Sequence, residues 1–218
     1  DLKVLNTADV FELFRCSQFS AWGPATKDGQ LIVGRNFDYP PILPRETCCI
    51  LAIQPAEKGL HATIDPLWFG LVGSGIACVR DDGLYLAPNS GGSSGGKIEV
   101  AHPTSGGLVL RQFAETASAE SAVDEFRQAI SGRVVLPMLF HLIPPSAPSK
   151  AAAPVIVEYV PASANKPEAI TVRPPDAAQP HALFVANHYV GSAADLNRGR
   201  YRQSTGRADD RGVRTEAR

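Results

Sequence analysis

A cysteine near the beginning of the chain is followed by a compact group of charged and polar side chains. Cys16 starts this stretch, and the group Arg35-Asn36-Phe37-Asp38 ends it. A cysteine is a nucleophile as the thiolate, which a nearby guanidinium stabilises. A carboxylate such as that of Asp38 can accept a hydrogen bond from an amine. The polar group is therefore either the solvated end of a strand or a set of side chains that serves the cysteine.

The residues between Cys16 and this group predict a β-hairpin. We expect strands at 17–26 and 30–37, joined at Lys27-Asp28-Gly29-Gln30. The Asp-Gly pair supplies the positive φ angles that a two-residue type I′ turn requires. Such a hairpin carries the polar group back toward the start of the first strand, where Cys16 lies.

The register of this hairpin decides how close the groups come. A two-residue turn pairs Trp22 with Arg35 and Phe19 with Asp38. Asp38 would then lie roughly 10 Å along the strands from Cys16. We therefore expect a β-bulge or a bent strand start that closes this gap. We also expect the strand to end between Arg35 and Asp38, because these side chains would otherwise face opposite sides of the sheet.

The remaining cysteines and the histidines are weaker candidates for chemistry. Three cysteines lie within apolar strand patterns and are expected to be small buried hydrophobes: Cys48, Cys49 and Cys78. The four cysteines form no CxxC pair and have no histidine at zinc-ligand spacing, so neither a disulfide framework nor a metal site is predicted. His188 alone among the histidines has a motif-like context, and we expect a structural role for it.

Two asparagines have a structural and a functional interpretation. Asn89 precedes the glycine-rich segment 90–96, which is either a flexible linker or a backbone that passes close to a ligand. Asn89 is accordingly either an ordinary turn residue or an amide donor to a ligand. Asn187 follows a predicted strand and has the same two interpretations.

The apolar pattern of the chain runs in the order strands, helices, strands. Short strands are expected first, at 48–54, 68–72, 76–79 and 84–87. Apolar residues then follow helical spacing from 108 to 130, as two helices or one helix broken near Ser118. The Pro/Ala/Ser-rich segment 131–154, which includes apolar residues 136–143, is expected to be a long surface excursion. Strands resume at 155–160, 169–173 and 182–186. Segregated strands and helices favour an α+β fold with helices packed against antiparallel sheets.

Composition limits the class of protein and its partners. The chain has 218 residues with 44% hydrophobic content, which is enough for one core and one domain. Its net charge of −1 without a basic stripe argues against nucleic acid or an anionic membrane surface as a partner. No apolar run reaches the ~18 residues of a membrane span. Residues 201–218 are almost devoid of apolar side chains, so we expect a disordered or out-of-frame tail.

The combination of motifs resembles a known enzyme family. The motifs are Cys16-Ser17, Trp22-Gly23-x-Ala25-Thr26-x-Asp28-Gly29, Gly34-Arg35-Asn36-x-Asp38, Asp82-Gly83-Leu84 through Asn89-Ser90-Gly91-Gly92, and Ala186-Asn187-His188-Tyr189. Together they resemble N-terminal-nucleophile (Ntn) hydrolases of the peptidase C45 family, the acyl-coenzyme A:6-aminopenicillanic acid acyltransferases. This family is related to the choloylglycine hydrolases, penicillin V acylases and acid ceramidase. The resemblance covers about residues 16–200.

The resemblance implies a fold and a maturation step. The fold would be a four-layer αββα sandwich of two antiparallel sheets over residues 16–200. It would be incomplete at its C-terminal end, because the family continues with further strands or helices. Residues 1–15 would be a propeptide or N-terminal segment, which the precursor removes by cutting its own backbone before Cys16.

The resemblance also implies roles for individual residues. Cys16 would supply the thiol nucleophile and, after the cut, its own α-amine as base. Arg35 would stabilise the thiolate or a substrate carbonyl, and Asp38 would accept a hydrogen bond from the new amine. Asn89 and Asn187 would donate to the oxyanion of an acyl intermediate. Arg200, in Gly199-Arg200-Tyr201-Arg202, resembles a further arginine of the family.

The expected activity is hydrolysis of a linear N-acyl amide through a Cys16 thioester, with a small-molecule substrate and with neither cofactor nor metal. Transfer of the acyl group to an amine would use the same residues, so acyltransferase activity stays open. A non-catalytic scaffold or binding domain is the alternative from another class. The acyl group, the compartment and any homo-oligomer also stay open.

Overall fold

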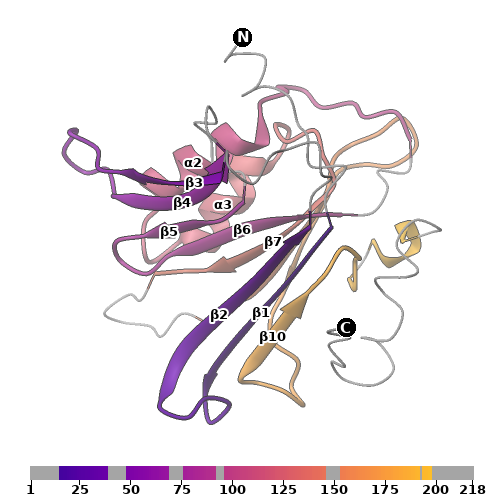
Figure 1. Cartoon of the computed structure of the whole chain (residues 1–218). Helices are drawn as coiled ribbons and strands as arrows, with labels where there is room; N and C mark the ends of the chain where they lie inside the picture. Colours follow the sequence, from indigo (N-terminus) through magenta and orange to yellow (C-terminus); the bar gives the residue numbers. More distant parts are fainter. Residues whose placement is uncertain are drawn as a thin grey trace.

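The computed structural model (Figure 1) describes residues 15–38, 48–68, 76–91, 96–145, 153–191 and 193–197. These residues form two antiparallel β-sheets and two α-helices, which is the α+β class that the sequence predicts. The strand order is β10-β1-β2 in the smaller sheet and β3-β4-β5-β6-β7-β8-β9 in the larger one. The predicted propeptide, except for Arg15, and the predicted tail lie outside the described residues.

The three-stranded sheet contains the predicted hairpin in a different register. Its strands are β1 (Arg15–Gly23), β2 (Gly29–Asp38) and β10 (Ala182–Val185). The predicted pairing is wrong, because Gln18 rather than Trp22 lies opposite Arg35. Asp38 therefore lies opposite Arg15, the residue next to Cys16, and the expected gap of roughly 10 Å does not exist.

The turn explains this register. The loop 24–28 replaces the predicted two-residue turn, since Pro24 has no N–H to donate to a strand ladder. Asp28 accepts a hydrogen bond from the Gln30 N–H at 3.1 Å, and Gly29 adopts a φ of +75°, which favours glycine. A bulge between Ala21 and Gly23 completes the change of register, whereas the bulge or bend expected near Cys16 is absent, because the pairing from Arg15–Asp38 to Ala21–Ile32 is continuous.

The seven-stranded sheet provides the centre of the fold. Its strands are β3 (Cys48–Ile53), β4 (Thr63–Trp68), β5 (Cys78–Arg80), β6 (Tyr85–Ser90), β7 (Met138–Ile143), β8 (Val155–Val160) and β9 (Ala169–Arg173). The predictions for β8 and β9 are confirmed to the residue, and β3, β5 and β6 overlap their predictions. β4 shares only Trp68 with the predicted strand at 68–72, the rest of which lies outside the described residues.

The prediction of a surface excursion over residues 131–154 is wrong at its centre. Met138–Ile143 forms β7, every residue of which is buried, between β6 and β8. A strand covered on both faces shows no alternation of apolar and polar residues. The proline-rich flanks therefore gave the only strong local signal, and they indicated a loop.

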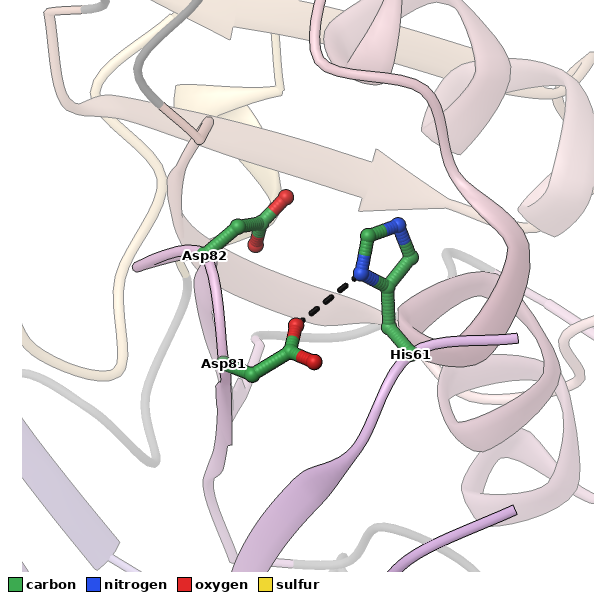
Figure 2. A group of neighbouring side chains, drawn as sticks. All are labelled: His61, Asp81 and Asp82. Carbon is green, nitrogen blue, oxygen red and sulfur yellow. Dashed lines mark hydrogen bonds and ion pairs between the residues drawn. The ribbon is translucent and has the colours of Figure 1, made fainter. Parts of the chain in front are cut away.

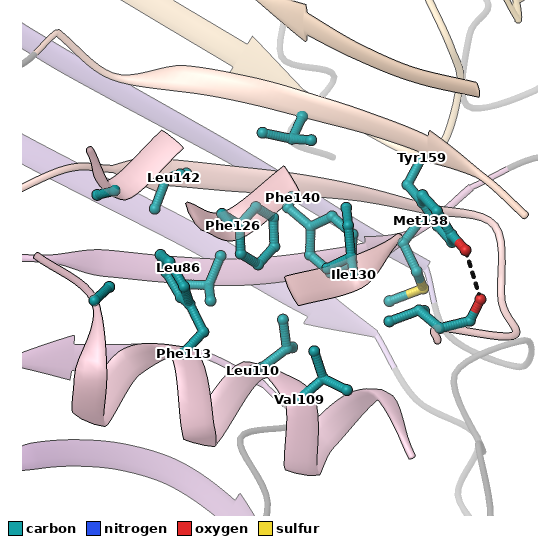
Figure 3. Packing of buried hydrophobic residues seen from close by; sticks show 14 of the residues in the cluster. Leu86, Val109, Leu110, Phe113, Phe126, Ile130, Met138, Phe140, Leu142 and Tyr159 are labelled. Atoms are coloured by element: carbon teal, nitrogen blue, oxygen red, sulfur yellow. Dashed lines mark hydrogen bonds between the residues drawn. The ribbon is translucent and has the colours of Figure 1, made fainter. Parts of the chain in front are cut away.

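Two helices cover one face of the large sheet. α2 (Gly106–Thr116) and α3 (Ala122–Ile130) confirm the predicted helical stretch with its break near Ser118. Figure 3 shows the apolar cluster between them and the sheet, in which Phe126 stacks edge-on against Phe113 and Phe140 at centroid distances of 4.8 and 4.9 Å. No helix among the described residues is long and apolar enough to cross a membrane.

The three-stranded sheet covers the opposite face of the large sheet. Leu183 and Val185 of β10 pack on Leu139 of β7 and Ile156 of β8. Adjacent residues of β7 therefore serve different layers, since Phe140 belongs to the helix-facing cluster. The seven-stranded sheet thus lies between the helices and the smaller sheet.

Candidate active site

A group of buried polar side chains lies between the two sheets. On β1 the residues Cys16, Gln18 and Ser20 are buried, whereas Ser17 and Phe19 are exposed. The alternation of a strand thus turns three polar or reactive side chains toward the large sheet. Burial of polar groups lowers stability unless they are hydrogen-bonded, so such a layer in place of hydrophobic residues suggests a use for it.

Arg35 lies beside the thiol of Cys16. Its Nη2 is 3.6 Å from Cys16 Sγ and donates to the Pro88 carbonyl at 2.8 Å, and its Nη1 donates to Asn89 Oδ1 at 3.3 Å. The guanidinium also lies 5.2 Å from the centre of the Phe37 ring. Within the described part of the chain, no carboxylate forms an ion pair with Arg35. Its charge therefore favours an anion at the position of the sulfur.

The thiol itself is neutral in this structure. Burial raises the pKa of Cys16 to about 11, and the negative charge of Asp38 adds to the rise. The positive charge of Arg35 and hydrogen bonds from the backbone N–H groups of Asp38 and Ser90 act in the opposite direction. The surroundings thus stabilise a thiolate only in part, and a base is needed to form one at neutral pH.

The backbone nitrogen of Cys16 is held by Asn187. The Cys16 N–H donates to Asn187 Oδ1 at 2.8 Å, and Asn187 Nδ2 donates to the Ser90 carbonyl at 2.8 Å. Asn187 is only 1% exposed. The side chain therefore joins β1 to β6, and the nitrogen that would become an α-amine already has an acceptor.

Asn89 connects the same elements from the other side of Cys16. Its Oδ1 accepts from Gln18 Nε2 at 2.6 Å and from Arg35. Its Nδ2 lies 3.0 Å from the Ala186 carbonyl and 3.5 Å from the Cys16 carbonyl. The Nδ2 groups of both asparagines thus donate to main-chain carbonyls here, and their expected role toward an oxyanion stays a prediction.

The two remaining predicted site residues are placed differently. Asp38 is exposed, and its carboxylate accepts from Asn36 Nδ2 at 3.1 Å. Its negative charge raises the pKa of the Cys16 thiol, whereas its carboxylate accepts a hydrogen bond from Asn36 on the same strand. Arg200 lies outside the described residues.

Gln18 and Tyr85 belong to the site although the sequence analysis did not select them. Tyr85 Oη donates to Gln18 Oε1 at 3.0 Å, and Gln18 Nε2 also reaches the Ala87 carbonyl at 3.3 Å. Burial raises the pKa of Tyr85, so the phenol stays protonated and remains a donor. Strand alternation from Cys16 could have identified Gln18, but no local signal marks Tyr85.

His141 extends the polar layer toward the far end of β1. Its Nε2 lies 3.1 Å from Ser20 Oγ, and its ring packs edge-on against Tyr85 at 5.5 Å. Burial, together with the charges of Arg35 and Arg173, lowers the pKa of His141 to about 3. The imidazole is therefore neutral and, being fully buried, supports the layer and does not face a substrate.

A second polar group, separate from the one around Cys16, includes the turn between β5 and β6. Figure 2 shows His61, Asp81 and Asp82, whose potential ligand atoms lie within 4.8 Å of one another. His61 Nδ1 is 2.9 Å from Asp81 Oδ1, and both Asp82 oxygens accept from Arg80 at 2.7 and 2.6 Å. The Asp82 carboxylate is thus paired with Arg80, and the Asp81 carboxylate is in contact with His61.

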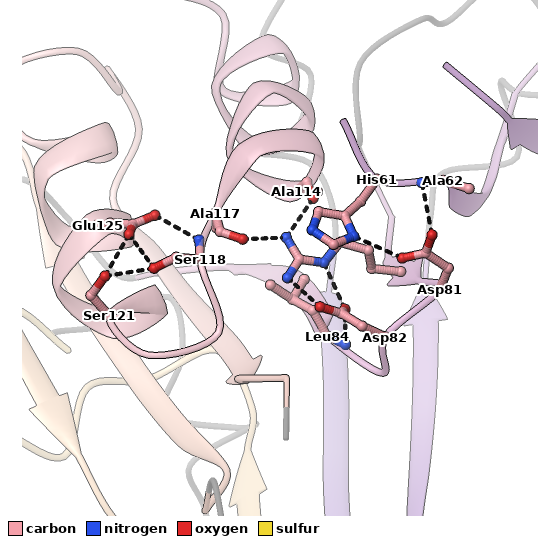
Figure 4. A network of polar contacts seen from close by, with 11 residues as sticks. His61, Ala62, Asp81, Asp82, Leu84, Ala114, Ala117, Ser118, Ser121 and Glu125 are labelled. Carbon is pink, nitrogen blue, oxygen red and sulfur yellow. Dashed lines mark hydrogen bonds and ion pairs between the residues drawn. The ribbon is translucent and has the colours of Figure 1, made fainter. Parts of the chain in front are cut away.

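Arg80 gives this second group a structural role. Its Nη1 donates to the carbonyls of Ala114 and Ala117 at the end of α2. Figure 4 labels both of these acceptors. Burial alone would raise the pKa of Asp82, but the hydrogen bonds from Arg80 and the Leu84 N–H outweigh it and lower that pKa. A cation at a helix C-terminus is favourable, so this group joins α2 to the sheet.

No protein-family model matches this chain, and no curated protein matches it. The geometry around Cys16 and the motifs quoted above are therefore the basis for a functional proposal.

Proposed function

We propose that this chain is the precursor of a cysteine Ntn hydrolase that cleaves linear N-acyl amides through a Cys16 thioester. The observation that carries the proposal is the environment of one residue. The Cys16 sulfur faces the guanidinium of Arg35, which has no ion-pair partner among the described residues, while its nitrogen faces Asn187 Oδ1. A residue whose sulfur is the nucleophile and whose nitrogen is the base needs a partner for each of these two atoms.

Maturation would begin with the thiol of the uncut chain. Cys16 Sγ attacks the carbonyl carbon of Arg15, the C–N bond breaks, and the thiol proton passes to the departing nitrogen. Water then hydrolyses the resulting thioester, which regenerates the thiol and leaves a carboxylate on Arg15. Because β1 begins at Arg15, the scissile bond lies at the start of an ordered strand, next to the polar layer.

Catalysis would use the new amine. The α-amine takes the thiol proton, and the thiolate attacks the acyl carbon of the substrate. The amine half of the substrate leaves with a proton from the α-ammonium, and a thioester remains on Cys16. Water attacks this thioester with the α-amine as base, and the carboxylic acid is released. Arg35 would favour the thiolate, and Asn187 Oδ1 would accept from the ammonium that forms.

Stabilisation of the oxyanion is the step that requires movement. Each well-placed donor contributes on the order of 3 kcal/mol to such a step. Asn89 and Asn187 would fill this role after their Nδ2 groups leave the carbonyls they now contact. The cut before Cys16 gives a reason for this movement of the side chains. It converts the Cys16 amide N–H, which now donates to Asn187 Oδ1, into an amine.

The four-layer αββα arrangement is part of this proposal. The outer face of the three-stranded sheet exposes apolar side chains, with Phe19 39% and Ile32 50% exposed. Such side chains on one sheet face favour a further layer packed there. This supports the proposed architecture, of which the helices, the large sheet and the small sheet would be three layers.

Mass spectrometry and a hydrolysis assay test the proposal together. The purified protein should contain a chain that starts at Cys16, and it should release acid from simple N-acyl amides. Cys16→Ala should abolish both the cut and the hydrolysis, whereas Cys78→Ala, at a buried cysteine outside the site, should retain both. Full activity with residues 1–15 still attached would contradict the mechanism. An acylated product formed from an added amine would identify acyl transfer at the same site.

A further inference from the structure

One face of the large sheet carries aliphatic side chains that nothing in the described structure covers. Ile50 is 74% exposed, Ile64 is 51% exposed and Val79 is 44% exposed, and Pro66 beside them is also exposed. These four residues, called here the aliphatic shelf, come from β3, β4 and β5. Isoleucine and valine in strands are usually half-buried, so their joint exposure on neighbouring strands suggests an apolar ligand.

The shelf is continuous with the face that bears the site. Val79 pairs with Tyr85 of β6, and Ile64 pairs with Val79, so the three side chains share one face of the sheet. Tyr85 is the donor to Gln18 beside Cys16. The small sheet ends at β2, its edge strand, and the shelf continues the same face beyond that edge.

A second contact path joins the shelf to the thiol. Trp68 lies on the shelf's face of β4, two positions beyond Pro66. Its ring packs against Phe37 at a centroid distance of 5.4 Å, and Phe37 in turn lies under the guanidinium of Arg35 at 5.2 Å. Arg35 is 3.6 Å from the Cys16 sulfur. Packed side chains therefore connect the nucleophile with the shelf, although Trp68 and Cys16 are themselves buried.

We propose that the aliphatic shelf binds the acyl chain of the substrate, so that the preferred substrates are N-acyl amides with an unbranched alkyl chain. This inference rests on the proposed function, and it assigns the substrate class of that same site. The distance from β6 to β3 across the strands is about 14 Å, which suits a chain of medium length. The shelf carries no charged side chain, so it would not bind a polar acyl group.

A protein partner fits the shelf less well. A stable protein interface buries about 800 Å² on each side, far more than four side chains expose. An alkyl chain lying on an open sheet face would lose contact with water on one side only. Each added methylene should therefore contribute about half of the free energy of its full burial. This contribution corresponds to about a twofold gain in affinity.

Calorimetric titration of the full chain with carboxylic acids tests the shelf without requiring turnover, because an acid is the product of the proposed reaction. Butyrate and decanoate are the probes, and decanoate should bind about 60-fold more tightly. Ile64→Asn should weaken decanoate binding at least fivefold and leave butyrate binding unchanged. Ile32→Asn is the matched control, because Ile32 is 50% exposed on the outer face of the small sheet. Val79→Thr, which keeps the side-chain shape, is a second variant should Ile64→Asn fail to fold.

The outcomes separate the shelf from the chemistry. Equal affinity for the two acids, or equal losses in the Ile64 and Ile32 variants, would overturn the shelf as an acyl site. Dimers that dissociate in Ile64→Asn, seen by sedimentation velocity together with an absence of decanoate binding, would overturn it in favour of self-association. Binding that depends on chain length, in a protein that never hydrolyses N-decanoyl amides, would uphold the shelf and contradict the proposed function alone.

Discussion

The side-chain oxygen of Asn187 accepts a hydrogen bond at 2.8 Å from the backbone N–H of Cys16, a residue 171 positions earlier in the chain. The Asn187 nitrogen donates to Ser90 on another strand. One buried amide therefore satisfies two backbone groups from different sheets. This contact fixes the start of β1, where the proposed cut takes place.

Replacing Asn187 should lower stability and prevent maturation. Asn187→Leu leaves the Cys16 N–H and the Ser90 carbonyl without these partners, which should reduce the free energy of unfolding by about 2–4 kcal/mol. Urea denaturation measures this change, and mass spectrometry measures the cut. Asn36→Ala is a control, because Asn36 is exposed and its loss should change stability by less than about 0.5 kcal/mol. Equal stability of the two variants would contradict the joining role of Asn187.

Arg35 should control the reactivity of the thiol. Its charge lowers the pKa of Cys16 against the effect of burial, so Arg35→Gln should raise that pKa further. The rate of alkylation by iodoacetamide as a function of pH reports the thiolate. We expect slower alkylation at each pH below about 11, and a fall in kcat/KM of about 100-fold. Arg35→Lys retains a positive charge and should recover part of the alkylation rate. Identical pH profiles for the two variants would show that charge is not what Arg35 contributes.

His141 should make stability fall in acid. Its pKa is lowered to about 3 in the folded chain, whereas a histidine in the unfolded chain titrates near its ordinary value of 6.5. The unfolded state therefore binds a proton that the folded state excludes. The resulting stability is fully present above pH 6.5 and is lost progressively between about pH 6.5 and 3, at up to about 1.4 kcal/mol per pH unit.

Denaturation with urea at several pH values checks this prediction. His141→Gln should remove the histidine's share of the pH dependence, so its stability should fall less steeply than that of the wild type in this range. His102→Gln, at an exposed position, should follow the wild type. A slope that His141→Gln does not change would mean that other groups cause the loss in acid.

Arg80 should be important for the attachment of α2. Its buried guanidinium donates to two carbonyls at the end of that helix and to Asp82. Arg80→Met leaves these acceptors without their donor and should reduce the free energy of unfolding by about 3–5 kcal/mol. Arg127→Met removes an exposed pair with Asp124 and should change it by less than about 1 kcal/mol. Thermal unfolding of both variants measures the difference, and similar melting temperatures would contradict the attachment role.

Local patterns were sufficient for most of the elements. The β-branched runs at 155–160 and 169–173 and the helical spacing from 108 to 130 appear as β8, β9, α2 and α3. These elements could be predicted because propensity and periodicity act over neighbouring residues. The hairpin itself was also correctly expected, but its predicted register placed Arg35 opposite Trp22, and only the family resemblance assigned Arg35 to the thiol.

The hairpin register and the identity of the central strand were decided by tertiary structure. Register depends on the turn, where Pro24 and the Asp28 side chain outweighed the Asp-Gly signal. β7 is buried on both faces, so the alternation that marks a strand is absent. The burial of β7 cannot be recognised without the neighbouring strands that produce it.

The sequence by itself determined the candidate residues Cys16 and Arg35 and the α+β class, because motifs and local periodicity carry that information. Asn89 and Asn187 were also candidates from the motifs, but only the tertiary structure decided their contacts and added Gln18 and Tyr85 to the surroundings of Cys16. Gln18, Tyr85, Asn89 and Asn187 meet there from β1, β6 and the segment after β10. Their contacts depend on how two sheets pack face to face, and packing across a sheet interface leaves no periodic signal along the chain.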